Sequence, residues 1–467
     1  PENELFVAAA AGRGEALAAL ERHDAALRSF GETVDKLQSL PPGRRYGVEQ
    51  LLGTFTMLEE RFAQENDYPH ALGYLKLAAG LVGPDQPKRR AELFDRLADL
   101  SQRAALASTT DAERRRYRGQ AARFLEEVAI LNRDDEERYS SQLWAAAQEY
   151  DRAGLVHDAR RVLDTFLEGR SRDPRLPAAM LIRGQALQAE GAVNEALRQY
   201  EELMSEYPKL EQAYRAAHLR AGLLRAAGHY EEAESALQAL LADDNLAPDA
   251  QVFRDALLDL CELLYDEERF ADAIGRLEDF ATLYPNDPER HRSAFMLADA
   301  YRRSGLELQR SAGVDEPQVR ETATNRLRRA AELFDNLSRE LTAQESLDDA
   351  EVVYDRLALL YQADCLFALN DPASLEAALN LYQQAAARFE REPTALTAQL
   401  QIATIHLRQG RPTEAARAIE RARWLLAGIP DAAFARSDGA GGRAHWERYL
   451  RTVGSSDLIE QALAGTP

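Results

Sequence analysis

Residues Gly191–Pro208 read GAVNEALRQYEELMSEYP, a segment that opens on glycine and closes on Tyr-Pro. Between these ends, Ala196, Tyr200 and Leu203 follow one another at steps of four and three residues, the spacing of one helix face. A similar segment, GHYEEAESALQALL, begins 37 residues later at Gly228. A pattern that recurs at such a period predicts a repeat architecture.

Four copies of the pattern align on one alanine, with spacings of 37, 37 and 40 residues. A glycine lies five residues before the first three alanines, and Glu268 holds that place in the fourth copy. A small residue lies twelve before each alanine, a large apolar residue four after it, and Leu or Phe seven after it. The alanines are Ala159, Ala196, Ala233 and Ala273; the glycines are Gly154, Gly191 and Gly228; the three further sets are Ala147, Gly184, Ala221 and Cys261, then Leu163, Tyr200, Leu237 and Leu277, then Phe166, Leu203, Leu240 and Phe280.

Each copy predicts two amphipathic helices joined by a turn. Glycine suits the turn because a positive φ costs it little, and small residues suit the place where two helices cross closely. Pro208 and Pro285 end the second helix of their copies. A single hairpin cannot bury its apolar face, so the unit has to recur along the chain.

The pattern resembles the tetratricopeptide repeat, whose motif runs W-x₂-L-G-x₂-Y and then Ala, Phe and Pro. Arg183 and Arg220 depart from the family, which prefers Leu there, and the copies are longer than the family's period of about 34 residues. The resemblance implies an all-α fold, an α-solenoid that is a right-handed superhelix of stacked helix-turn-helix repeats. It is carried best by Leu257, Leu260, Cys261, Leu264, Ala273, Leu277, Phe280 and Pro285, and next by Gly184, Leu187, Ala196, Tyr200, Leu203 and Pro208.

The resemblance covers residues 137–430 and predicts a repeat domain there. Inside it, a first helix at His291–Gly305 is followed late by a second helix around Ala330, so we expect an insertion near residues 306–325, which includes SAGVDEP. The late second helix indicates that both helices are lengthened and that a loop is added.

Residues 1–136 predict helical hairpins of a degenerate form of the same repeat. PPGRR from Pro41 and GPDQPK from Gly83 indicate breaks between hairpins, and STTDAE from Ser108 indicates a capping box. For residues 431–467 we expect a loop, ARSDGAGG, and then two capping helices, HWERYL and DLIEQAL. End repeats need such caps to present a polar outer face.

Composition and spacing exclude several classes of function. The net charge of −21 argues against nucleic acid as the main partner, and no apolar run of about 18 residues predicts a transmembrane segment. The eight histidines show no metal-binding spacing, and no phosphate loop or nucleophile elbow is present in the sequence. We therefore expect no enzyme, no cofactor and no metal, and we expect Cys261 and Cys365 to be buried packing thiols.

The resemblance also implies that the first helices line a concave surface that binds a partner. Aromatic anchors at Trp144, Tyr265 and Phe295 among charges of both signs suit a peptide or protein partner. Acidic residues outnumber arginines by 18 to 5 between Glu231 and Asp299, which indicates a solvated acidic face or a basic partner. The predicted partner-binding residues are Trp144, Gln148, Arg152, Gln185, Arg215, His218, Arg225, Asp255, Glu262, Tyr265, Asp266, Phe295, Asp299 and Arg302.

We therefore expect a non-catalytic protein-interaction scaffold, and we expect charge reversal at Asp255, Glu262 and Asp266 together to weaken its complex. Two alternatives stay open: a self-assembling structural homo-oligomer, or the regulatory region of an enzyme whose catalytic domain lies outside these residues. The stretch FATLYPNDPERHRSAFMLADAYRRSG from Phe280 resembles repeats of bacterial cell-envelope proteins of outer-membrane assembly and of the Tol-Pal system. We expect a periplasmic or outer-membrane-associated protein whose signal or lipid anchor was removed before Pro1, with the cytoplasm as the alternative.

Overall fold

The computed structural model describes residues 2–40, 47–169, 172–311, 316–435 and 442–454. All regular secondary structure in these residues is helical, in 22 helices that follow one another along the chain. The predicted all-α solenoid class is confirmed. The chain forms two compact units, Pro1–Leu223 and Leu224–Pro467, which are described one at a time.

In unit 1, each helix from α3 to α10 packs against the next one in the chain, α1 packs against α2, and α2 also reaches α4. This is the stacking that amphipathic hairpins need in order to bury their apolar faces. The helices are α1 (Glu2–Ala19), α2 (His23–Gln38), α3 (Val48–Gln64), α4 (Tyr68–Leu81), α5 (Pro87–Ala107), α6 (Asp111–Leu131), α7 (Glu136–Ala153), α8 (Val156–Leu167), α9 (Leu176–Ala189), α10 (Val193–Glu206) and most of α11 (Glu211–Ala226).

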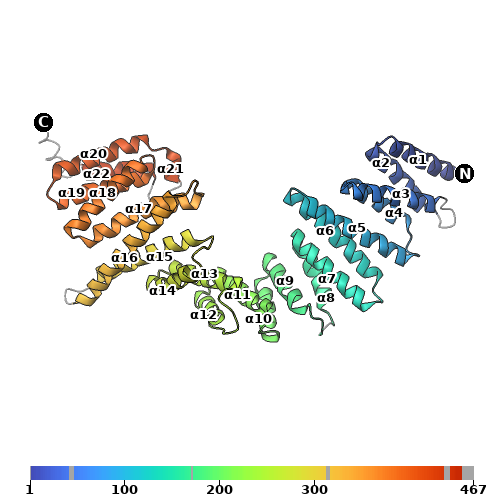
Figure 1. The fold of residues 1–467 in the computed structure, drawn as a ribbon, viewed down its shortest axis with the longest axis horizontal. Coiled ribbons are helices and arrows are strands. Elements are labelled where there is room, and N and C mark those ends of the chain that lie inside the picture. The colour runs from blue at the N-terminus through green and yellow to red at the C-terminus, as the bar shows by residue number, and fades with distance from the viewer. Residues whose placement is uncertain (1, 41–46, 170–171, 312–315, 436–441, 455–467) are drawn as a thin grey trace. The chain divides into compact units, whose positions relative to one another are not determined.

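Unit 2 has the same organisation from α12 to α20, and α22 packs on α20 (Figure 1). First helices of successive hairpins also meet, since α15 contacts α13 and α17. The helices are α12 (Tyr230–Leu241), α13 (Gln251–Asp266), α14 (Phe270–Leu283), α15 (Arg290–Ser311), α16 (Pro317–Thr342), α17 (Asp349–Leu369), α18 (Pro372–Arg388), α19 (Pro393–Arg408), α20 (Pro412–Gly428), α21 (Asp431–Ala435) and α22 (Arg443–Gly454).

The aligned residues of the four repeat copies form the buried layer between the two helices of each hairpin. All four alanines are at most 1% exposed, and the large apolar residues that follow them are also buried. A Cβ at Gly184 would overlap the ring of Tyr200, so the small residue is required by a close helix crossing. Helices α10 and α14 end just before Tyr207-Pro208 and Tyr284-Pro285, as predicted.

The turns between the helices of a hairpin use the left-handed backbone region. Gly154, Gly191 and Gly228 have φ values of 72°, 78° and 82°, and Glu268 adopts the same region with a φ of 59°. The geometry of the turn is therefore kept in the fourth copy although the glycine is missing. A residue with a Cβ pays about 1–2 kcal/mol in this region.

Replacing Glu268 with glycine should raise the free energy of unfolding of unit 2 by about 1 kcal/mol, because the Cβ strain is relieved and the extra freedom of unfolded glycine offsets only part of the gain. The midpoint of urea unfolding measures this change. The matched control is Glu267→Gly, one residue earlier in an ordinary helical conformation with a φ of −77°. That control should lower the midpoint, and a rise in both variants would contradict the argument.

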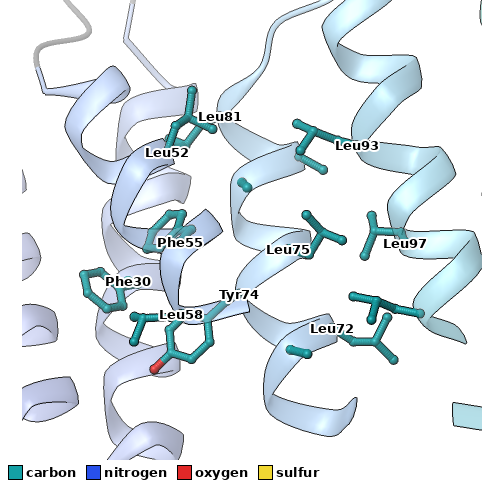
Figure 2. Close-up of a cluster of buried hydrophobic side chains, with 14 of the residues drawn as sticks. Phe30, Leu52, Phe55, Leu58, Leu72, Tyr74, Leu75, Leu81, Leu93 and Leu97 are labelled. Carbon is teal, nitrogen blue, oxygen red and sulfur yellow. The ribbon is translucent and has the colours of Figure 1, made fainter. Parts of the chain in front are cut away.

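The helices that precede residue 137 bury a large apolar cluster. Figure 2 shows Phe30, Phe55 and Tyr74 from α2, α3 and α4, with Leu97 of α5 beyond them. The rings of Phe30 and Phe55 meet edge to face with centroids 4.9 Å apart, and all four residues are at most 1% exposed. The weakly patterned part of the sequence therefore carries as complete a core as the clear repeats.

Two predicted punctuation signals in unit 1 are confirmed. Helix α4 ends at Leu81 and α5 begins at Pro87, so GPDQPK is a break. Thr110 is the N-cap of α6, and its hydroxyl accepts a hydrogen bond from the Glu113 backbone N–H at 3.3 Å. The break predicted at PPGRR falls outside the described residues.

The long segment that precedes the late second helix is mostly helical. Helices α15 and α16 have 22 and 26 residues, so residues 306–311 extend α15 and residues 317–325 belong to α16, while residues 312–315 are outside the described part. Trp446 and Leu450 of α22, within HWERYL, are buried in a cluster with α20 residues. DLIEQAL and residues 436–441 of the predicted loop lie outside the described residues.

Candidate partner-binding face

In unit 1 the predicted face residues lie on α7, α9 and α11, and α7 contacts α9 directly. Trp144 is half-buried, with its ring 5.7 Å from that of Phe166, so one side of the indole is packed. Gln148 and Gln185 are also half-buried. Arg152 is exposed and donates to Glu149 at 2.9 Å. This part of the face offers an anchored aromatic ring beside hydrogen-bonding groups.

The α11 residues of unit 1 differ from each other in exposure. Arg215 is exposed and His218 is half-buried. Because Arg215 is held less by its surroundings than Trp144, it can follow a partner's carboxylate at the cost of side-chain entropy alone.

In unit 2 the face is crossed by a chain of ion pairs that joins three first helices. Glu262 of α13 accepts from Arg225 of α11 at 3.4 Å and from Arg292 of α15 at 2.8 Å. Arg225 also pairs with Asp266 at 2.8 Å. The Glu262 side chain is 15% exposed and the Asp266 side chain is 63% exposed. Glu262 is therefore a link between helices, and Asp266 is the more accessible carboxylate.

Asp255 lies at the start of α13 and is also occupied by contacts within the unit. It accepts hydrogen bonds from Arg254 and Gln251, each at 2.8 Å. Arg254 reaches across to Asp287 in the turn before α15, and its hydrogen bond holds the pKa of that carboxyl below its usual range. The acidic stretch of the sequence is thus largely neutralised by arginines from neighbouring helices.

The prediction for Asp299 has to be corrected, because its side chain is internal. Asp299 is 1% exposed and accepts from Arg302 and Arg303, each at 2.7 Å through Nε, and from the Tyr265 hydroxyl at 2.5 Å. Burial, and then the negative charge of Asp299, raises the pKa of Tyr265. A carboxylate enclosed in this way is not available to a partner.

Arg302 and Phe295 are also largely internal. The Arg302 side chain is 13% exposed, and its guanidinium lies 4.0 Å from the centre of the Tyr361 ring. Phe295 stacks on Tyr354 with centroids 5.0 Å apart. The reason is tertiary: α17 packs onto α15 and covers the helix face that the repeat register places toward a partner.

The chemistry available in the described residues is that of recognition. No group of three or more His, Cys, Asp and Glu in the described ranges is placed to hold a metal ion, and none of the helices described is long and apolar enough to cross a bilayer. Cys261 and Cys365 are buried, as predicted, and burial raises the pKa of Cys261 to about 12. A thiol held protonated in this way is a poor nucleophile.

Sequence reasoning missed the cross-helix pairs that occupy this face. The signal for Glu262 and Arg225 was their separation of 37 residues, one repeat period, which places two residues at the same register on neighbouring first helices. Opposite charges one period apart are therefore candidates for an ion pair in such an array. The pairing of Glu262 with Arg292 has no comparable signal.

Comparison with known proteins gives matches at two separated places. Tetratricopeptide repeat family profiles match residues 178–209 and residues 373–433. No curated protein matches the chain in sequence. The two family matches are what assign the repeat type.

Solved structures similar to the chain include three helical-repeat proteins. A tetratricopeptide repeat protein from Parabacteroides merdae is 14% identical with a TM-score of 0.34, covering 69% of this chain and 98% of its own. Yeast Tom70 is 12% identical with a TM-score of 0.29, covering 99% and 100%. The Naa15/Naa10 structure bound to HypK-THB is 16% identical with a TM-score of 0.27, covering 99% and 72%.

Proposed function

We propose, from the premise that the chain is a tetratricopeptide repeat protein, that it is a non-catalytic scaffold which binds a peptide or protein partner along its first helices. Tetratricopeptide repeats are in general protein-interaction modules without catalytic activity, and that much follows from the repeat type. The finer proposal names the face and its chemistry.

The observation that carries the proposal is the ion-pair chain Arg225–Glu262–Arg292 across α11, α13 and α15. Its members are between 15% and 43% exposed on their side chains, so they are neither free in solvent nor lost in the core. Groups held in place before binding lose little entropy when a partner arrives. Exposed Asp266 beside this chain, and exposed Arg152 and Arg215 in unit 1, are the groups that we propose a partner contacts.

The structure changes the design of the test. Reversing the charges of Asp255, Glu262 and Asp266 together would break links inside the chain, because Glu262 joins three helices. A face variant restricted to exposed residues, Arg152→Glu, Arg215→Glu and Asp266→Arg, avoids this problem. Ion pairs lost at such exposed positions cost about 0–1 kcal/mol each.

The matched control carries the same change in net charge on second helices: Arg198→Glu, Arg276→Glu and Asp279→Arg, all exposed on α10 and α14. Its two changes on α14 swap the partners of an existing pair, Arg276 with Asp279. Each purified variant is used as bait in lysate, with quantitative mass spectrometry as readout and thermal unfolding as a check of folding. We expect the face variant to lose at least ten-fold of a captured protein that the control retains.

Equal capture by both variants would contradict the proposed face. Recovery of the bait's own copies alone, lost from the face variant, would support the self-assembling alternative instead.

We further propose a bacterial cell-envelope setting, periplasmic or outer-membrane-associated, with the cytoplasm as the alternative. The support is the local resemblance of residues 280–305 to envelope repeat proteins. Fractionation of cells that express the tagged native gene distinguishes the two compartments.

A further inference from the structure

A groove of about 940 Å³ opens in unit 1 between the second helices α8 and α10, with α9 at its base. This volume lies in the range of sites that bind small molecules or side chains, about 300–1,000 Å³. Its apolar lining comes from all three helices and their ends. These residues are Leu167, Leu176, Met180 and Tyr207.

Arg183 explains why the groove is open. It occupies a register position at which tetratricopeptide repeats prefer leucine. Its Nε donates to Asp164 of α8 at 2.6 Å, and its Nη1 donates to Gln199 of α10, which is 4% exposed. Because a guanidinium needs hydrogen-bond partners, α8, α9 and α10 are joined here by a polar link instead of a closed apolar contact.

The charges that line the groove are mostly negative. The lining residues include four carboxylates, Asp164, Glu168, Glu202 and Glu206, and one cation, Arg183. Asp164 is neutralised by Arg183, which leaves an excess of three negative charges. Glu202 and Glu206 are exposed and lie one turn apart on α10, so they form one acidic edge beside the apolar lining.

We propose that this groove binds a basic amphipathic segment of a protein partner. An aliphatic side chain of the segment packs against Met180, Leu167 and Tyr207, and an adjacent Arg or Lys pairs with Glu202 and Glu206. The surface lies on second helices and is separate from the face of the first helices, so it does not rest on the function proposed above. It gives the chain a second binding surface for a partner of defined charge.

Unit 2 contains a natural comparison at the same place in its own repeat. A groove of about 810 Å³ lies between α16 and α18 over α17. Its charged lining residues are Asp335, Arg339 and Arg388, so its charge is slightly positive. A basic segment should therefore select the α8–α10 groove by electrostatics, although the two grooves have similar size.

The four methionines make the proposal directly testable. Met180 lines the groove, while Met57 on α3 and Met296 on α15 lie elsewhere. The probe is a capped ten-residue peptide of alternating leucine and arginine, added to the full chain labelled with ¹³C at methionine methyl groups. We expect a saturable shift of the Met180 methyl resonance with Met57 and Met296 unmoved.

Two variants and one altered peptide separate the groove from general attraction to an acidic protein. Glu202→Gln with Glu206→Gln should weaken peptide binding at least ten-fold. The control Glu127→Gln with Glu195→Gln removes the same charge from exposed residues of unit 1 outside the groove and should change affinity less than two-fold. A peptide with serine in place of leucine should lose the Met180 shift.

An unmoved Met180 at saturation, or equal weakening by both double variants, would overturn the proposal. The face variant Arg152→Glu, Arg215→Glu and Asp266→Arg should leave the Met180 shift intact. Its failure in partner capture and a failure of peptide binding here are therefore separate results.

Discussion

Replacing Asp299 with alanine should lower the free energy of unfolding of unit 2 by about 3–5 kcal/mol, the range for breaking a buried ion pair by removing one partner. The substitution leaves the Arg302 guanidinium, on a side chain 13% exposed, without its carboxylate. It also removes the acceptor of the Tyr265 hydroxyl. Urea unfolding followed by circular dichroism measures the loss.

Two further variants isolate the cause of that loss. Asp266→Ala removes an equivalent charge whose side chain is 63% exposed, and it should change stability by no more than about 1 kcal/mol. Asp299→Ala combined with Arg302→Met should recover part of the stability, because the unpaired buried cation is gone. Equal losses from Asp266→Ala and Asp299→Ala, or a double variant as unstable as the sum of both single changes, would contradict this account.

Replacing Gly184 with alanine should destabilise unit 1 by about 1–3 kcal/mol, the cost of forcing an extra methyl into a well-packed core. The new Cβ would overlap the ring of Tyr200, which is fully buried and cannot swing into solvent. Helices α9 and α10 would have to separate. The midpoint of thermal unfolding reports the change.

The control is Gly222→Ala in α11, where an added Cβ meets no atom within 4 Å. That variant should be neutral or more stable, by up to about 1 kcal/mol, because alanine favours helix over glycine. Tyr200→Leu in the Gly184→Ala background should reduce the penalty, with a coupling energy of about 1 kcal/mol or more. Equal effects at Gly184 and Gly222 would show that helix propensity, and not the crossing, decides the outcome.

Much of the architecture could be predicted from local patterns. The residues Ala196, Tyr200 and Leu203 mark one helix face by their spacing, and that face is buried. The turn glycines and the prolines after α10 and α14 mark the ends of helices through backbone properties that act within a few residues. Such signals are readable because each depends only on near neighbours in sequence.

The candidate face could be predicted in its register but not in its availability. The register placed Trp144 and Asp266 on first helices, where they are accessible in part. It placed Asp299 and Phe295 in the same way, and both lie beneath α17 or among arginines. The exposure of a side chain depends on the next hairpin, whose position is not written in the local pattern.

The same division explains the α8–α10 groove. The departure from the repeat pattern at Arg183 is visible in the sequence, but its partners Asp164 and Gln199 are 19 and 16 residues away on other helices. The sequence by itself determined that the chain is an array of helical hairpins, because periodic apolar residues and turn residues act locally. Only the tertiary structure decided which charges are neutralised and which surfaces stay open, because these depend on the helices that pack against each residue.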